Sequence, residues 1–125
     1  MDQTTDEQFV SSYIAAWSTR DGDERRSLID RVYAADATFY ANEPGDEAVQ
    51  RHGRTEIMEN ITQVNERLTQ GSGLATQRTA FAANHDLLRV SWQMTTPEGD
   101  VAMSGMNLLI RNSDGRVVRD YILIG

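Results

Sequence analysis

The last nine residues, VVRDYILIG, have the composition of a buried strand, yet they contain one carboxylate, that of Asp120. Alternate residues of a strand share a face, so we expect Asp120 to point the same way as Val118 and Ile122. A carboxylate among apolar side chains must find a partner, take up a proton or border a wet cavity. Which of these holds decides whether Asp120 can serve as a base.

An arginine on a neighbouring strand is the first candidate partner. The stretch DLLRVSWQM alternates two sets of side chains: the apolar Leu88, Val90, Trp92 and Met94, and the polar Arg89, Ser91 and Gln93. Periodicity alone favours a polar set that faces water. The isolated carboxylate favours the other reading, in which Arg89 pairs with Asp120 across a pocket and keeps it ionised. We therefore predict this pair, although purely structural ion pairs have the same pattern.

Four further side chains could hold a water molecule or a carbonyl oxygen. Tyr40 and Asn42 are two residues apart in FYAN, so an extended segment would place both on one face. The alternative is that Tyr40 packs and Asn42 opens the NEPG turn. Tyr13 lies on the apolar face of the first expected helix, and Asn107 interrupts the apolar GMNLLI. Each could be a satisfied core group, or the two could direct donors into one cavity and stabilise an oxyanion.

The elements that must position these residues change period halfway along the chain. Apolar residues at helical spacing predict helices within residues 4–22, 23–39 and 53–73. Strand-length runs follow at residues 74–84, 86–96, 101–112 and 116–125, separated by turn residues. Short connections predict an antiparallel meander. The sequence therefore predicts one α+β domain over residues 1–125, with a cavity between the helices and the sheet.

Composition excludes several classes of function. The chain has no cysteine and only two histidines, His52 and His85, so we expect no metal site. A net charge of −7 disfavours nucleic acid and anionic membranes as partners. The acidic start, MDQTTDEQF, lacks the basic and apolar parts of a signal peptide, and no apolar run is long enough to span a membrane. A cytoplasmic location is the resulting expectation.

The order of these segments resembles a known superfamily. YIAAW, then DGDERRSLIDRVYAADATFY, then the meander ending in GRVVRDY, is similar to nuclear-transport-factor-2-like proteins. More narrowly, it resembles the SnoaL-like group, with its polyketide cyclases, ketosteroid isomerase and limonene-epoxide hydrolase. The resemblance spans nearly the whole chain. It implies a cone-shaped α+β fold in which three N-terminal helices pack on a curved antiparallel sheet around an internal pocket.

The resemblance also implies roles for individual residues. Tyr40, Asn42, Arg89 and Asp120 fall where the epoxide hydrolase holds and activates water, but Ser91 stands in place of its acid. Tyr13 falls where ketosteroid isomerase has its oxyanion-hole tyrosine, Asn107 where it has a protonated aspartic acid, and Ala41 near the place of its base. We take Tyr13, Asn107, Ser91 and Trp17 as expected substrate-binding residues.

Two functions remain open at this point. One is a cofactor-independent enzyme with Asp120 as general base, acting on a small, largely apolar, polyketide-like or steroid-like substrate by water addition, epoxide opening or aldol-type cyclisation. The other is a non-catalytic binding or accessory protein of the same fold. The resemblance further implies a homodimer through the outer face of the sheet, where we expect Leu88, Val90 and Trp92 to need cover.

Overall fold

The computed structural model describes residues 3–41 and 49–125, so Asn42 lies outside the described residues. The helical segments are α1 (Gln3–Ser18), α2 (Gly22–Val32), α3 (Gly53–Val64) and a π-helical continuation, η1 (Asn65–Gly71), and two strands lie between α2 and α3. Asp21 caps α2, because its Oδ1 accepts from the backbone N–H groups of Asp23 and Glu24. No helix among these residues is long and apolar enough to cross a membrane.

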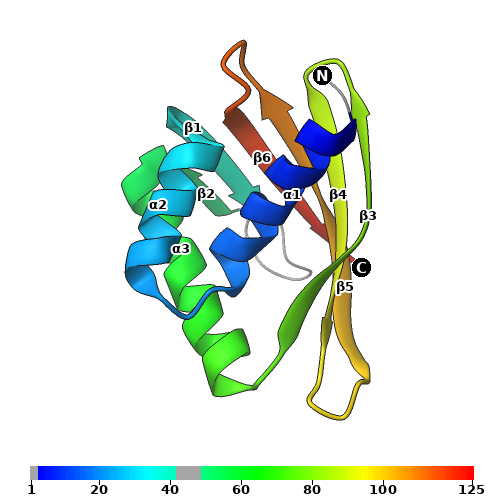
Figure 1. Cartoon of the computed structure of the whole chain (residues 1–125). Coiled ribbons are helices and arrows are strands. Elements are labelled where there is room, and N and C mark those ends of the chain that lie inside the picture. The colour runs from blue at the N-terminus through cyan, green and yellow to red at the C-terminus, as the bar shows by residue number, and fades with distance from the viewer. Residues whose placement is uncertain (1–2, 42–48) are drawn as a thin grey trace.

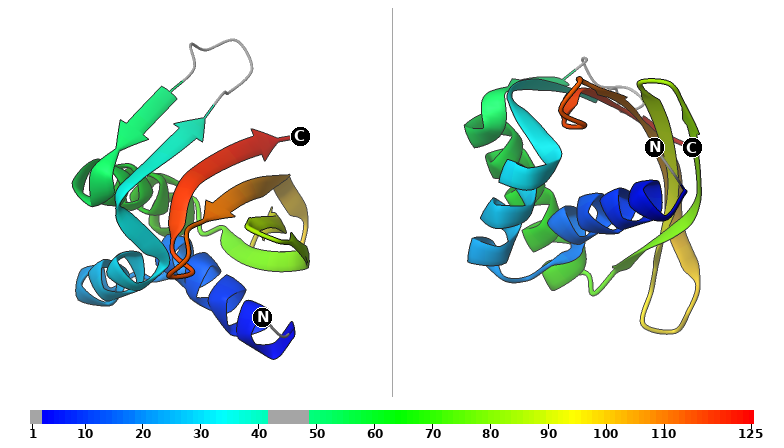
Figure 2. Two further views of the ribbon diagram at one scale, coloured as in Figure 1. Left: turned by 90° about the horizontal axis from the view of Figure 1, so that it is seen from above. Right: turned by 45° about the horizontal axis from the view of Figure 1, so that its top comes forward.

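The strands form one curved six-stranded sheet in the order β2-β1-β6-β5-β4-β3, which wraps around the helices (Figures 1 and 2). They are β1 (Tyr33–Ala41), β2 (Val49–His52), β3 (Ala75–Asn84), β4 (Leu87–Thr95), β5 (Val101–Arg111) and β6 (Val117–Ile124). The meander from β3 to β6 is antiparallel, as predicted. The whole sheet is mixed, however, because β1 joins β6 in parallel. The α+β fold with helices packed on the sheet is confirmed.

The boundary of the second helix differs from the prediction. The helix ends at Val32, and Tyr33 begins a strand instead of continuing the helix to Phe39. Tyr33 pairs with β6, and residues 38–41 pair with β6 on one side and β2 on the other. This tertiary pairing outweighs the local helical pattern. Tyr33, expected within the helix, instead belongs to a strand and is fully buried in the core.

The core lies between the helices and the inner, concave face of the sheet. Leu88 and Val90 are fully buried there, and Trp92 is buried on the same face. The expectation that these three residues lie on the outer face and need a partner there is therefore wrong. Their alternation with exposed Arg89 has the predicted period, but the face assigned to it was reversed.

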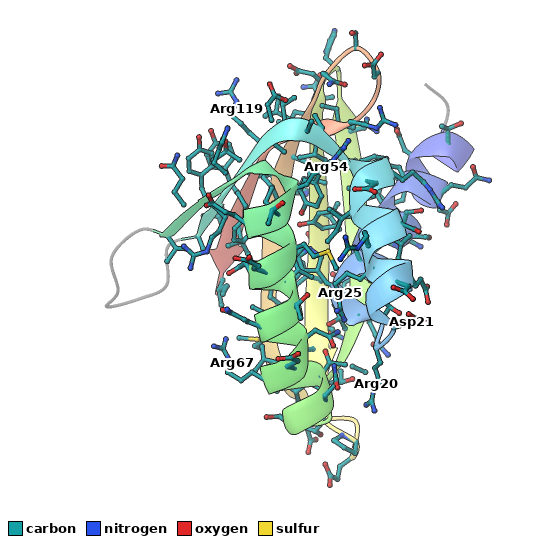
Figure 3. All side chains as sticks on the ribbon, turned by 90° about the vertical axis from the view of Figure 1, so that its left-hand side faces the viewer. Arg20, Asp21, Arg25, Arg54, Arg67 and Arg119 are labelled. Atoms are coloured by element: carbon teal, nitrogen blue, oxygen red, sulfur yellow. The ribbon has the colours of Figure 1, made fainter. Side chains whose placement is uncertain are left out.

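Contacts near both ends of α1 fix its position over the sheet. Near its start, Asp6 and Arg111 of β5 form a buried ion pair with a 3.1 Å separation. At its other end, Asn65 Nδ2 donates to the carbonyl oxygens of Trp17 and Thr19, at 2.8 and 3.0 Å. Arg25, which lies between α2 and α3 in Figure 3, also donates to the Thr19 carbonyl. These contacts hold Tyr13 and Trp17 in place.

Gly105 lets β5 accommodate a large neighbour. A Cβ atom at this position would lie 2.7 Å from the Leu123 carbonyl oxygen and 2.8 Å from Cζ2 of Trp92. Both distances are shorter than normal contacts, and the first involves backbone. Glycine therefore allows the Trp92 indole to lie across the strand.

The first prediction follows from this close approach. Gly105→Ala should lower the free energy of unfolding by ~1–3 kcal/mol, because the added methyl group forces the backbone or Trp92 to move. Gly22→Ala is the matched control, since a Cβ atom there would meet nothing within 4 Å. Urea denaturation of both variants measures the difference. Equal stability of the two proteins would contradict the packing described here.

Candidate functional site

Three neutral donors hold the carboxylate of Asp120, which is fully buried in β6. Asn107 Nδ2 donates to its Oδ1 at 2.7 Å. The hydroxyl groups of Tyr13 and Tyr33 both donate to its Oδ2, at 2.8 and 2.6 Å. The donors come from β5, α1 and β1, so three separate parts of the fold meet at one side chain. Both carboxylate oxygens are thereby satisfied.

The predicted partner of Asp120 is not among these donors. Arg89 is exposed, and it lies on the opposite face of β4 from the buried Leu88 and Val90. In addition, β5 lies between β4 and β6 in the sheet. The predicted Arg89–Asp120 pair is therefore wrong. Tyr33 takes part instead, and the sequence reading missed it because this residue was assigned to a helix.

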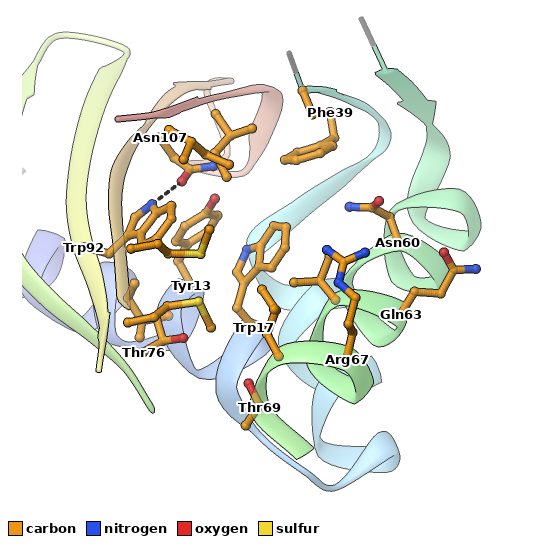
Figure 4. A pocket seen from close by; sticks show the side chains of 18 of the residues that line it. Tyr13, Trp17, Phe39, Asn60, Gln63, Arg67, Thr69, Thr76, Trp92 and Asn107 are labelled. Carbon is orange, nitrogen blue, oxygen red and sulfur yellow. Dashed lines mark hydrogen bonds between the residues drawn. The ribbon is translucent and has the colours of Figure 1, made fainter. Parts of the chain in front are cut away.

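The orientation of the Asn107 amide is determined by Trp92. The indole Nε1–H of Trp92 donates to Asn107 Oδ1 at 2.8 Å, the dashed line in Figure 4. An indole can only donate, so Oδ1 must face Trp92 and the NH₂ group must face Asp120. Space for the indole comes from Gly105. A continuous hydrogen-bonded chain thus runs from Trp92 through Asn107 to Asp120.

Burial makes Asp120 the group that titrates nearest neutrality in this cluster. Desolvation raises the pKa of Asp120 from its ordinary value of 3.8 to about 6, although the hydrogen bonds from Tyr33, Asn107 and Tyr13 each favour the ionised form. Burial, followed by the negative charge of Asp120, raises the pKa of both Tyr13 and Tyr33 well above 10.0. At pH 7 the cluster therefore consists of a carboxylate with two neutral phenols, and Asp120 can accept a proton.

A cavity of about 270 Å³ lies next to this cluster, between the helices and the inner face of the sheet. It is close to the lower limit of roughly 300–1,000 Å³ for ligand pockets. Tyr13, Asn107 and Trp17 line it, so the prediction that Tyr13 and Asn107 border one interior cavity is confirmed. Asp120 is not a lining residue. It lies behind Tyr13 and Asn107, which separate it from the cavity.

The other expected site residues lie elsewhere. Tyr40 stacks on Tyr121, with ring centroids 4.8 Å apart, and does not line the cavity. Its neighbours Phe39 and Ala41 do line it, because alternate residues of β1 face the helices. Ser91 borders a separate hollow with Leu123 and other residues. The expected position of Tyr40 and Ser91 beside Asp120 is therefore wrong.

The cavity has two polar ends and an aromatic middle (Figure 4). Tyr13 and Asn107 form one end, and three polar side chains from the α3 and η1 segment form the other: Asn60, Gln63 and Arg67. Trp17 and Phe39 lie between the ends, with ring centroids 5.7 Å apart. The Trp17 indole N–H is buried and makes no hydrogen bond of normal geometry with the described residues. It nevertheless lies close enough to the Tyr33 hydroxyl to act against the rise in the pKa of that group.

The apolar lining determines what the cavity can bind. It includes Met94 and Met103 from the sheet and Ile122 from β6. Residues 3–41 and 49–125 contain no group of three or more His, Asp or Glu residues that could hold a metal ion. The arrangement can therefore enclose a small apolar molecule beside a phenol. The Tyr13 proton is donated to Asp120, so the Tyr13 oxygen can accept from a ligand but cannot donate to it.

The second prediction concerns stability and pH. The folded-state pKa of Asp120, about 6, exceeds its ordinary value of 3.8, so between these values the folded protein binds more protons than the unfolded chain. The contribution of Asp120 to stability is therefore largest below pH 4 and is lost as pH rises through 6, by ~3 kcal/mol in all. Asp120→Asn keeps the shape and removes this titration.

Urea denaturation of both proteins from pH 4 to pH 7.5 tests this. The unfolding free energy of the wild type minus that of Asp120→Asn should fall as pH rises, with its midpoint between the two pKa values. A difference that is constant with pH would show that Asp120 titrates normally. A difference that rises with pH would show an ion-paired carboxylate of lowered pKa, which the described contacts do not contain.

Comparison with known proteins identifies the fold. No protein-family model and no curated protein matches the chain. Among solved structures, a proposed isomerase of the SnoaL-like family from Agrobacterium tumefaciens superposes with a TM-score of 0.84 at 21% identity, covering 98% of this chain and 99% of that one. A proposed polyketide cyclase from Sinorhizobium meliloti superposes with a TM-score of 0.65 at 17% identity, covering 93% of this chain and 94% of that one.

A protein of ketosteroid isomerase-like fold from Catenulispora acidiphila, solved with trimethylamine, gives a TM-score of 0.66 at 15% identity and covers 92% of this chain and 83% of that one. Identities this low establish shared architecture only. The fold implied by the sequence resemblance is confirmed: this chain has the SnoaL-like, nuclear-transport-factor-2-like fold, built around an interior pocket.

Proposed function

We propose that this protein is a cofactor-independent enzyme that removes a proton from a small, largely apolar substrate, or from water beside it, with Tyr13 as the contacting group and Asp120 as the base behind it. One observation carries the proposal. The Tyr13 hydroxyl belongs to a cavity-lining residue and donates, at 2.8 Å, to a buried carboxylate whose pKa is about 6. A base with a pKa near the working pH suits proton transfer.

The proton moves in a relay. A substrate proton passes to the Tyr13 oxygen while the Tyr13 hydroxyl proton passes to Oδ2 of Asp120. The two transfers occur together, so no tyrosinate intermediate forms. This matters because burial raises the pKa of Tyr13 well above 10.0. Asn107 remains bonded to Oδ1 and keeps the carboxyl group oriented. Once Asp120 is protonated, it returns the proton by the reverse route, which leaves product and an ionised carboxylate.

Proton removal next to a carbonyl group suits this relay best. It is the first step of an isomerisation through an enol and of an aldol-type cyclisation. The same base could activate water for addition or for epoxide opening. However, Arg89, Tyr40 and Ser91, which the epoxide-hydrolase resemblance assigns to water and epoxide, do not line the cavity. The carbonyl reactions are therefore favoured over epoxide opening.

A non-catalytic binding or accessory protein is the second candidate. The observation in its favour is that Asp120 does not line the cavity and that both its oxygens are already occupied by donors. In that case the cluster only fixes α1, β1, β5 and β6 to one another. The cavity would still bind a small ligand, as the trimethylamine-bound relative supports.

The third prediction separates the two candidates by a matched pair of variants. Tyr13→Phe and Tyr33→Phe each delete one hydroxyl that donates to Asp120 Oδ2, but only Tyr13 lines the cavity. The assay is exchange of the methyl hydrogens of acetophenone for deuterium, followed by NMR. Tyr13→Phe should lower the catalysed rate by about 100-fold or more, whereas Tyr33→Phe should retain most of it.

The pH profile provides the control. The wild-type rate should rise as pH increases through about 6, because Asp120 must be ionised to accept the proton. Tyr33→Phe removes a hydrogen bond that lowers the pKa of Asp120, so the midpoint should move to higher pH while activity remains. Equal losses in both tyrosine variants would indicate a structural cluster. Binding of acetophenone without exchange by the wild type would support the binding protein.

Assembly and location complete the proposal. We propose a homodimer through the outer face of the sheet, where Leu123 is 51% exposed and Tyr40 stacks on Tyr121. Burial of such apolar surface favours association. A cytoplasmic location is proposed on the cysteine-free, acidic composition.

The fourth prediction tests the dimer. Light scattering at micromolar concentration should give twice the mass of the 14.0 kDa chain. Leu123→Lys should weaken the association because it places a charge in the apolar contact, and Arg31→Lys on α2 is the control outside that face. A wild-type protein that remains monomeric would refute the proposal.

A further inference from the structure

We infer that the cavity selects an anion: a small apolar acid whose carboxylate binds at the arginine end while a carbonyl-type oxygen lies at the Tyr13–Asn107 end. This inference rests on the proposed function and specifies its substrate class. Its basis is the distribution of charge around the cavity, which is independent of the proton relay.

The formally charged side chains that line the cavity, among residues 3–41 and 49–125, are both arginines. Among the described lining residues these are Arg51 and Arg67, and no Asp or Glu accompanies them. The chain as a whole has 19 acidic and 12 basic residues, so the local sign is opposite to that of the molecule. A cavity wall of one sign selects ligands of the other sign.

Each arginine lies on the face of its helix or strand that lines the cavity. Asn60, Gln63 and Arg67 recur at helical spacing and form one polar stripe on α3 and η1. In Figure 4 the Arg67 guanidinium lies between Trp17 and the side chains of Asn60 and Gln63, and Arg67 is exposed, so this end of the cavity is open to solvent. Arg51 is two residues from Val49 on β2, and both line the cavity. The amides of Asn60 and Gln63 add hydrogen-bond donors beside the Arg67 guanidinium.

Neither arginine has an acidic partner among the described residues. The ion pairs in residues 3–41 and 49–125 join Arg54 to Asp30, Arg78 to Glu7 and Arg111 to Asp6. Within the part of the chain that the structure describes, Arg51 donates to the backbone carbonyl of Gln50, at 3.4 Å. Both arginines line the cavity, and a planar guanidinium matches a carboxylate in geometry as well as charge.

The opposite end of the cavity determines how the ligand is oriented. Asp120 lies behind Tyr13 and Asn107 and repels an anionic group there when it is ionised. An acid therefore binds with its carboxylate toward Arg67 and Arg51. Its apolar body lies along Trp17 and Phe39, and its second oxygen reaches the end where proton transfer takes place.

Calorimetry with three rigid probes of nearly equal shape tests the inference. They are 4-acetylbenzoate, its neutral amide 4-acetylbenzamide and the cation of 4-(aminomethyl)acetophenone. The wild type should bind the carboxylate about tenfold more tightly than the amide, and the cation most weakly. This preference should decrease at high salt.

Variants test whether the two arginines cause the preference for the carboxylate probe. Arg51→Gln combined with Arg67→Gln should abolish the preference for the carboxylate while leaving binding of the amide nearly unchanged. Arg26→Gln combined with Arg31→Gln, which removes two exposed arginines of α2 outside the cavity, is the control for net charge and should keep the preference. Tyr13→Phe should also keep it, so loss of the proton relay is distinguishable from loss of anion selection.

Three results would overturn the inference. One is a wild-type protein that binds the amide or the cation as tightly as the carboxylate. Another is a double variant with an unchanged preference for the carboxylate. The third is absence of measurable binding for all three probes, which would show that this cavity does not take acids of this class.

Discussion

The burial of one carboxylate governs much of this structure. An ionised Asp120 without partners would cost several kcal/mol in an apolar core, so the fold must bring donors to both of its oxygens. It does so from three directions, with Tyr13 of α1, Tyr33 of β1 and Asn107 of β5. The parallel pairing of β1 with β6 brings Tyr33 within reach, and the contacts near both ends of α1 hold Tyr13 in place. The complete cluster therefore forms only when α1, β1, β5 and β6 are all in their native positions.

The nature of the donors matters as much as their number. An arginine partner would have held the pKa of Asp120 low and left it unable to accept a proton near neutral pH. Neutral phenol and amide donors stabilise the anion less, so burial prevails and the pKa of Asp120 rises to about 6. Replacing the predicted Arg89 pair with the observed cluster thus changes the chemistry. The carboxylate becomes a group that can change its protonation state, and Tyr13 carries that capability to the cavity.

Sequence reasoning predicted what depends on local pattern and composition. The isolated carboxylate in VVRDYILIG and the alternation in DLLRVSWQM were predicted from residue types and spacing. The convergence of Tyr13 and Asn107 on one cavity was implied by the family resemblance. For β4 the periodicity favoured the observed orientation, with Arg89 and Ser91 directed away from the core, and the search for a partner for Asp120 wrongly reversed it. For β1 the pattern could not say which face is the inner one, because alternation has the same period in either orientation, and Tyr40 was misplaced for this reason. Tyr33 was missed because its role depends on pairing with β6, some 85 residues further along the chain.

The two polar ends of the cavity can be understood together. A buried negative charge at one end makes acidic residues unfavourable elsewhere in the same small space, since like charges separated by low-dielectric material repel strongly. The described lining follows this logic, with arginines at the far end and no Asp or Glu. Their positive charge lies across an aromatic middle from Asp120, so the potential varies along the length of the cavity. A ligand with a negatively charged end and an uncharged end is aligned by that potential before any specific contact forms. Such alignment reduces the entropic cost of placing its reactive atoms beside Tyr13.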